Sequence, residues 1–496
     1  MTSRIGAVAI GISLLLATAV MAQSDPQTAV LPLSTKSPQV DKLLQQAWDL
    51  GLDEVEQAKE VEVLRKAVKI EPNFAMGHEL LAQSSLDPAE QVREQKKAFA
   101  LRQNANPAER LIIEWYQDAG DHKLISAITE MNDVLSQYPH DKWVVYMANL
   151  WLTTQTQYER AAAVYERSGI TNSPGLMNNV AYDYAYMRQF EKAFTLMDQY
   201  IAALPHDANP QDSYAEILRM AGHFNQAIEH YRDALAINPN FYSSQFGLAD
   251  TYSLMGDQKR ARQEYAIAFH KFPLPELHSV QWQTRAATTY IREGAFKKAD
   301  QAFQAIADNA HRKHLSQVEA DTYRQMAMYQ VDPRTALALL NKAEAAIQEG
   351  ENSMPAAIEQ ERAQILRARV ELAVRTSDPK TAQATVDRLS KMAETSNDKL
   401  IETSYHGAAG AWFSSKHQYK EAIPELEEDI NNPFSLELLA VAYQQTGDLM
   451  GAKQTTETLA NTNDPTLEQA LVVPAFRKCY ENPSCSSNLK DASFMH

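Results

Sequence analysis

Small and apolar residues recur at a fixed interval of 34 residues over the central part of the chain. Alanine marks this interval at Ala193, Ala227 and Ala261. Within each interval the apolar residues fall three or four positions apart, which is the spacing of one face of an α-helix. A proline closes each interval, and proline ends helices because it lacks a backbone donor. The pattern therefore predicts a helix–turn–helix hairpin repeated along the chain.

The same pattern continues on both sides with less regular spacing. Apolar residues fall at helical intervals from Gln39 onward, and Ala127 and Ala161 are again 34 residues apart. Further alanines follow at uneven intervals as far as residue 462. A single hairpin of this kind cannot bury its apolar face, so neighbouring hairpins must stack. We expect about ten to twelve hairpins in an all-α, open solenoid.

The central units resemble the tetratricopeptide repeat. The unit over residues 208–241 carries the family's residues Tyr214, Ala215, Gly222, Phe224, Ala227, Tyr231, Ala234 and Pro239. The preceding unit departs from the family at Arg188, where glycine is usual. The resemblance implies a right-handed superhelical solenoid whose concave surface binds other molecules.

The quality of the repeats divides the chain. We predict degenerate hairpins over residues 39–173, a well-formed array over 174–313 and irregular repeats over 314–462. Residues 463–496 are expected to form a C-terminal cap or tail. This tail holds both cysteines of the chain, Cys479 and Cys485. In an exported protein such a pair is expected to form a disulfide, and two free thiols are the alternative.

The first 22 residues have the pattern of a signal peptide. A positive residue precedes an apolar stretch that ends in small residues, which predicts cleavage after Ala22. The mature protein is then periplasmic or secreted, and an uncleaved anchor is the alternative. Residues 23–38, rich in Pro, Ser, Thr and Gln, are expected to be a flexible linker. No other apolar run reaches the ~20 residues of a membrane helix, so no membrane span is expected after cleavage.

Composition and motifs narrow the classes of function. The net charge of −16 argues against nonspecific nucleic-acid binding, which needs basic patches. The pair His78 and Glu79 begins like a zinc-protease helix, but Ala82 stands where the second histidine is required. No nucleotide-binding or hydrolase motif is found. We therefore expect a protein that is not an enzyme and that uses no cofactor or metal.

The resemblance also implies a binding groove along the first helices of successive units. Carrying the family's face positions over to this chain gives Asn178, Asn179, Tyr182, Tyr186, Asp212, Glu216, Arg219, Phe246 and Asp250. The carboxylates are expected to select a basic segment of a protein or peptide partner, and the aromatic rings to anchor it. The alternative is that these are ordinary surface residues.

Three functions remain in view. The first is a non-enzymatic scaffold of a bacterial envelope that binds a partner in its concave groove. The second is a sensor that holds a small molecule or glycan in the solenoid cavity. The third is an enzyme concealed in residues 310–462. The repeats, the leader and the missing catalytic motifs together favour the scaffold.

Overall fold

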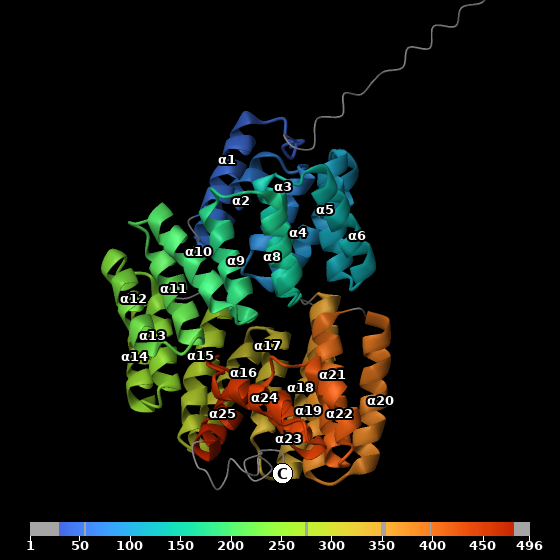
Figure 1. The fold of residues 1–496 in the computed structure, drawn as a ribbon. Coiled ribbons are helices and arrows are strands. Elements are labelled where there is room, and N and C mark those ends of the chain that lie inside the picture. Colours follow the sequence, from blue (N-terminus) through green and yellow to red (C-terminus); the bar gives the residue numbers. More distant parts are fainter. Residues whose placement is uncertain (1–28, 54–55, 273–275, 349–353, 397, 481–496) are drawn as a thin grey trace, which may run out of the picture.

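The computed structural model describes residues 29–53, 56–272, 276–348, 354–396 and 398–480. Within these ranges it contains 25 α-helices and no β-strand (Figure 1). The helices α1 to α24 pair in sequence as hairpins, and α25 follows them. The predicted all-α repeat solenoid is therefore confirmed.

The first four hairpins form the upper part of the molecule in Figure 1. Their helices are α1 (Pro38–Trp48), α2 (Gln57–Ile70), α3 (Ala75–Ser84), α4 (Pro88–Leu101), α5 (Pro107–Gly120), α6 (Leu124–Gln137), α7 (Lys142–Thr154) and α8 (Tyr158–Ser168). A π-helical turn, η1 (Asp49–Asp53), follows α1, and a 3₁₀ turn, η2 (Arg102–Asn104), follows α4.

The next four hairpins contain the regular repeats. Their helices are α9 (Pro174–Tyr186), α10 (Phe190–Ala203), α11 (Ala208–Met220), α12 (Phe224–Ile237), α13 (Tyr242–Leu254), α14 (Gln258–Lys271), α15 (Glu276–Arg292) and α16 (Phe296–Arg312). The repeating alanines Ala193, Ala227 and Ala261 have no exposed surface, because each lies where its helix meets another. The aromatic residues Tyr231 and Tyr265 are 2% exposed and fill the remaining space. Small and large residues therefore alternate along the packed seam, as close helix packing requires.

The last hairpins form the lower part of the molecule in Figure 1. Their helices are α17 (Ser316–Met328), α18 (Pro333–Gln348), α19 (Pro355–Arg375), α20 (Pro379–Ser396), α21 (Lys399–Ser415), α22 (Tyr419–Glu427), α23 (Pro433–Thr446) and α24 (Leu449–Ala460). The final helix α25 (Leu467–Tyr480) buries Val473 and Phe476 and packs against α15, α23 and α24. It covers apolar surface of the last hairpin, as a cap does.

The turn inside a hairpin often needs a left-handed residue. Gly222 and Gly256 supply it with φ angles of 85° and 93°. In the hairpin α9/α10 the same position is Arg188, with a φ of 59°. Such a conformation costs a residue with a Cβ roughly 1–2 kcal/mol. The family's turn is thus kept here without the family's glycine, and an arginine side chain is placed at the edge of the repeat.

The segment before α1 is ordered where the structure describes it. The Leu31 amide donates to Asp141 Oδ2 at 2.8 Å, and the Ser34 amide donates to Glu109 Oε1 at 2.8 Å. Leu31 is 5% exposed. The prediction of a flexible linker over residues 23–38 is therefore wrong for residues 29–37, because acidic side chains of the first hairpins satisfy their backbone donors.

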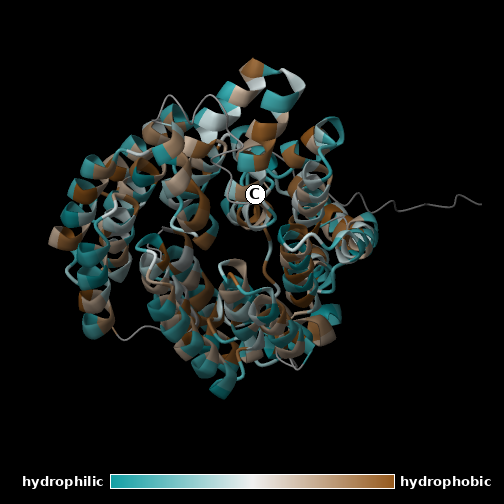
Figure 2. Ribbon diagram, turned by 90° about the horizontal axis from the view of Figure 1, so that it is seen from below, coloured by the Kyte–Doolittle hydropathy of each residue, from teal (hydrophilic) through white to brown (hydrophobic). Residues whose placement is uncertain are grey.

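The solenoid closes on itself, contrary to the open superhelix that we expected. His122, in the turn before α6, lies 3.3 Å from Asp398 at the start of α21. Farther along, Arg188 Nη2 donates to the carbonyl oxygen of Asn461 at 3.0 Å. When the molecule is seen from below, turned by 90° from the view of Figure 1, the helices surround a common centre (Figure 2). The concave side of the central repeats therefore faces the C-terminal part of the chain and not open solvent.

Candidate functional site

The first helices of the central hairpins, α9, α11, α13 and α15, contact one another in sequence, and we call the side of the array that they form the concave channel. Residues 461–466, the connection between α24 and α25, contact Arg188 after α9 and Met220 at the end of α11, and we call them the inserted segment. Asn463 Nδ2 donates to the carbonyl oxygen of Met220 at 3.2 Å, at the C-terminal end of α11. Arg477 of α25 also binds the segment. Its Nε donates a hydrogen bond to the Ala460 carbonyl oxygen at 2.7 Å, and its Nη2 donates one to Asn463 Oδ1 at 2.7 Å.

Four arginines lie on or directly after first helices of the central hairpins, and we call Arg188, Arg219, Arg285 and Arg292 the arginine cluster. Arg219 is only 2% exposed. Its Nη2 donates to Glu216 Oε1 at 2.6 Å, whereas its Nε and Nη1 have no hydrogen-bond partner among the described residues. Arg292 Nη2 is also without one. Buried donors are normally paired, so these N–H groups mark a place where a ligand or water is expected.

The carboxylates of the channel are already engaged by internal donors. Asp250 is 1% exposed and accepts hydrogen bonds from Tyr265 and from Arg285 Nη1, the latter at 2.6 Å. Asp212 accepts one from Ser244 at 2.6 Å, and burial raises the pKa of its carboxyl to about 7. These acids therefore lack the free charge that attraction of a basic partner would require.

We expected all the predicted groove residues to project from an open face, and this expectation is wrong for the five that are buried. Those that are at most 8% exposed are Asn178, Asp212, Arg219, Phe246 and Asp250. Helices of the adjacent hairpins cover several of them: Phe246 packs on Trp282 of α15, and Asp250 accepts hydrogen bonds from Tyr265 of α14 and Arg285 of α15. Asn178 Oδ1 and the Nδ2 atom of the neighbouring Asn179 have no hydrogen-bond partner in the part of the chain that the structure describes.

The aromatic residues divide into a buried and an accessible group. Phe246 is fully buried, and its ring stacks on Trp282 with 4.5 Å between ring centroids. Tyr182 donates to Glu216 Oε2 at 3.0 Å and so ties α9 to α11. Tyr186 is 39% exposed and stacks on Tyr158 at 4.7 Å. Of the predicted aromatic anchors, Tyr186 is therefore the accessible one.

The inserted segment brings its own carboxylate to the arginine cluster. Burial raises the pKa of Asp464, and the negative charge of Glu216 raises it further, whereas the positive charges of Arg219, Arg188 and Arg285 lower it only in part. Asp464 is half-buried, while Asn461 and Thr466 at the two ends of the segment are exposed.

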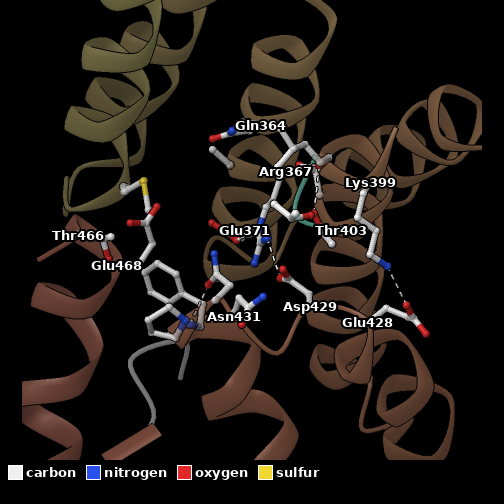
Figure 3. A pocket seen from close by; sticks show the side chains of 18 of the residues that line it. Gln364, Arg367, Glu371, Lys399, Thr403, Glu428, Asp429, Asn431, Thr466 and Glu468 are labelled. Carbon is white, nitrogen blue, oxygen red and sulfur yellow. Dashed lines mark hydrogen bonds and ion pairs between the residues drawn. The ribbon is translucent and has the colours of Figure 1, made fainter. Parts of the chain in front are cut away.

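Thr466 of the inserted segment also lines a pocket of about 320 Å³, which we call the central pocket. Tyr158 from the first part of the chain lines it together with residues of α17, α19 and α21. Figure 3 shows Thr466 and Glu468 on one side and Lys399 and Glu428 on the other. The charges are paired across its wall, with Arg367 Nη1 2.7 Å from Asp429 Oδ2 and Lys399 3.0 Å from Glu428 (Figure 3).

Sequence analysis missed four contributors to this site. Trp282 and Arg285 lie on α15, in a unit whose register follows an irregular insertion. Tyr158 begins a second helix, which the family's face positions do not include. Asp464 lies in the segment assigned to a C-terminal tail, where no repeat pattern points to the channel.

Cys479 lies at the end of α25 and is 9% exposed, whereas Cys485 lies outside the described residues. Their pairing stays a prediction. Within the described ranges, no group of three or more His, Cys, Asp or Glu side chains is placed to hold a metal ion. In those same ranges, no helix combines the length and hydropathy needed to cross a membrane.

The fold and its inward channel define a helical-repeat solenoid. Residues 218–283, from the end of α11 into α15, match the sequence profile described as the tetratricopeptide repeat. This match confirms the resemblance of the central units to the tetratricopeptide repeat. No curated protein matches its sequence.

Solved structures with some similarity include a tetratricopeptide repeat protein from Parabacteroides merdae, 14% identical with a TM-score of 0.35, over 62% of this chain and 99% of that one. The Cut9–Hcn1 hetero-tetramer of the APC/C is 12% identical with a TM-score of 0.39, over 85% and 76%. IFIT1 with m7Gppp-AAAA is 14% identical with a TM-score of 0.36, over 85% and 99%. At these values none of them indicates a ligand for this chain.

Proposed function

We propose that this protein is a non-enzymatic scaffold that binds another protein in its concave channel. The tetratricopeptide fold generally serves protein–protein interaction. The observation that carries the proposal is Arg219, a guanidinium 2% exposed with two N–H groups unpartnered among the described residues. An unmade hydrogen bond of this kind costs roughly 1–3 kcal/mol, so a partner that supplies an acceptor gains affinity.

The chemistry of the channel favours an acidic partner segment over the basic one expected from sequence. The carboxylates of Asp250 and Glu216 already accept hydrogen bonds from Arg285 and Arg219. The same pairing speaks against an enzyme, because neither carboxylate is left as a free base beside a nucleophile. The donors without a partner among the described residues are Asn179 Nδ2 and guanidinium N–H groups of Arg219 and Arg292, and guanidinium groups pair best with carboxylates.

We further propose that the protein works in a bacterial envelope. The pattern of residues 1–22 supports export, and these residues lie outside the part of the chain that the structure describes. In that compartment the pair Cys479 and Cys485 is expected to be oxidised and to fasten the tail that follows α25.

Site-specific crosslinking tests the binding proposal. A photoreactive amino acid replaces Tyr186, at the accessible edge of the channel, and in a control chain it replaces Ile267 on α14, which is 49% exposed. We expect one protein to be crosslinked in envelope extracts through position 186 and not through 267. Equal crosslinking at both positions, or at neither, contradicts a partner in the channel.

The central pocket gives a second candidate, a small polar ligand. Its volume of about 320 Å³ lies at the lower end of the range of small-molecule sites, roughly 300–1,000 Å³. A ligand there would contact both Tyr158 and Lys399 and so join the two parts of the chain. A thermal-shift screen with oligosaccharides and polar metabolites tests this candidate. A hit should stabilise the intact chain and not a Thr403→Trp variant, whose ring fills the pocket.

A further inference from the structure

We propose that the central pocket binds a small organic cation with a primary amine, and that the carboxylate of Glu468 pairs with its ammonium group. This inference rests on the second candidate function, a small polar ligand in the central pocket, and names the chemistry of that ligand. It is independent of a protein partner in the concave channel.

The three cations that line the pocket already have carboxylate partners. The ion pairs are Lys399–Glu428 at 3.0 Å, Arg367–Glu371 at 2.9 Å, Arg367–Asp429 at 2.7 Å and Arg324–Glu361 at 2.9 Å. An anionic ligand would have to compete with these carboxylates for the same cations. The pocket therefore disfavours an anion, although two arginines and a lysine line it.

Glu468 differs from the other carboxylates of the pocket wall. It lies in the first turn of α25 and is half-buried. Within the described part of the chain, its side chain takes part in no hydrogen bond and no ion pair. A charge on the wall of a cleft attracts its counter-ion more strongly than one on an open surface, because the low-dielectric walls focus the field. The charge that the pocket leaves unused is therefore negative, and it calls for a cation.

Neutral polar groups of the wall complete the site. The side chains of Gln364 on α19 and Asn431 between α22 and α23 have no hydrogen-bond partner in the described ranges, and neither has the hydroxyl of Tyr158 on α8. An ammonium group has three donors and no acceptor, so a carboxylate together with neutral oxygens satisfies it. The neutral groups that remain can bind hydroxyl groups of the same ligand.

The donor set and the space suit an organic cation better than a metal ion. Mg²⁺ and Ca²⁺ take roughly six to eight oxygen ligands. In the ranges that the structure describes, no three His, Cys, Asp or Glu side chains are grouped to hold such an ion. The volume of about 320 Å³ is that of a small-molecule site. A compact amine meets these conditions.

Calorimetric titration of the full chain tests the inference. The probes are two primary amines, putrescine and glucosamine, and each has a neutral counterpart of the same skeleton, butanediol and glucose. We expect both amines to bind the intact chain and the neutral counterparts to bind at least about tenfold more weakly, because a hydrogen bond to a charged group is stronger than a neutral one. Added salt should weaken the binding of the amines, since it screens the attraction.

The substitution Glu468→Gln identifies the carboxylate that binds the amine. It removes the charge, keeps the size and breaks no hydrogen bond among the described residues, so the chain should fold. We expect it to weaken the binding of both amines at least about tenfold. The matched control is Glu457→Gln on α24, where the side chain is 50% exposed. The control removes the same charge from the chain and should leave the dissociation constant unchanged.

A second variant keeps the test valid if Glu468→Gln does not fold. Asn431→Ala removes an exposed side chain from a turn in the pocket wall and should weaken the binding of the amines roughly threefold. The inference is overturned if neither amine binds, if the neutral counterparts bind as tightly, or if the folded variant of the pocket binds the amines as the intact chain does. Tight binding of butanediol or glucose would still support a small polar ligand, so the inference and the candidate function can fail separately.

Discussion

Replacing Gly175 with alanine tests how the closed solenoid is built at its upper end. Gly175 is the second residue of α9, and a Cβ there would lie 1.8 Å from the carbonyl oxygen of Leu52 in η1. The obstacle is a backbone atom, so no side chain can turn away to relieve the clash. Glycine is needed here for the close approach and not for its backbone angles, since its φ is not positive.

The cost of Gly175→Ala follows from two opposing effects. Overpacking a tight contact costs typically ~1–3 kcal/mol. If η1 instead moves away, the side chain of Leu52, now 2% exposed, meets solvent. The loss of its burial costs about 1.5–3 kcal/mol, which is a similar magnitude. Alanine favours the helix over glycine by roughly 0.5–1 kcal/mol. The net expectation is a loss of about 1–2 kcal/mol in the free energy of unfolding.

Gly120→Ala is the matched control for this substitution. Gly120 ends α5, and the nearest atoms to its added Cβ belong to the Gln95 side chain at 3.4 Å, an ordinary contact. Urea unfolding should show Gly175→Ala destabilised and Gly120→Ala unchanged or slightly stabilised. Hydrogen exchange should speed up within residues 49–53 of the first variant alone. If both variants unfold alike and exchange alike, the packing of η1 on α9 is wrong.

Three further predictions concern the repeat, the pH and export. Ala227→Trp should cost on the order of 1–3 kcal/mol in urea unfolding because Ala227 has no exposed surface, whereas Asn225→Trp on the exposed face should cost little. Burial raises the pKa of Glu79 from 4.5 to about 8, so its stabilising effect is complete below pH 4.5 and is lost as the pH rises through 8. The melting temperature should therefore fall between pH 5 and pH 8, and Glu79→Gln should reduce that fall; a fall as steep in the variant would show that Glu79 does not cause it. Export should yield a mature protein that begins at Gln23, and N-terminal sequencing of an intact leader in the cytoplasm would contradict it.

The hairpins could be predicted from the sequence because local packing determines them. A hairpin needs a small residue where its helices touch and a large one beside it, and Ala227 and Tyr231 show this requirement directly. The same requirement recurs in each unit, so the 34-residue period is visible without any structure. The positions of the central helices follow from it.

The closure of the solenoid could not be predicted, because it depends on contacts between distant parts of the chain. Arg188 meets Asn461 across 273 positions. No repeat pattern carries that information, since curvature accumulates from small rotations between hairpins. One signal was available: Arg188 stands where the family has glycine, and a residue kept in a strained conformation often has a further role. The burial of Phe246 and Asp250 comes from Trp282 and Arg285 of α15, in a unit whose register follows an irregular insertion, so it could not be inferred from the regular repeats.

Small-angle X-ray scattering of the chain in solution tests the central claim, that the solenoid closes around its own concave channel. A compact chain of this length has a radius of gyration of about 23 Å. An open stack of the same hairpins, with helices 8–10 Å apart, would be roughly 100 Å long and have a radius of gyration above about 30 Å. The structure predicts a value near the first figure. A value above the second would show that the channel is open and that residues 461–466 do not occupy it.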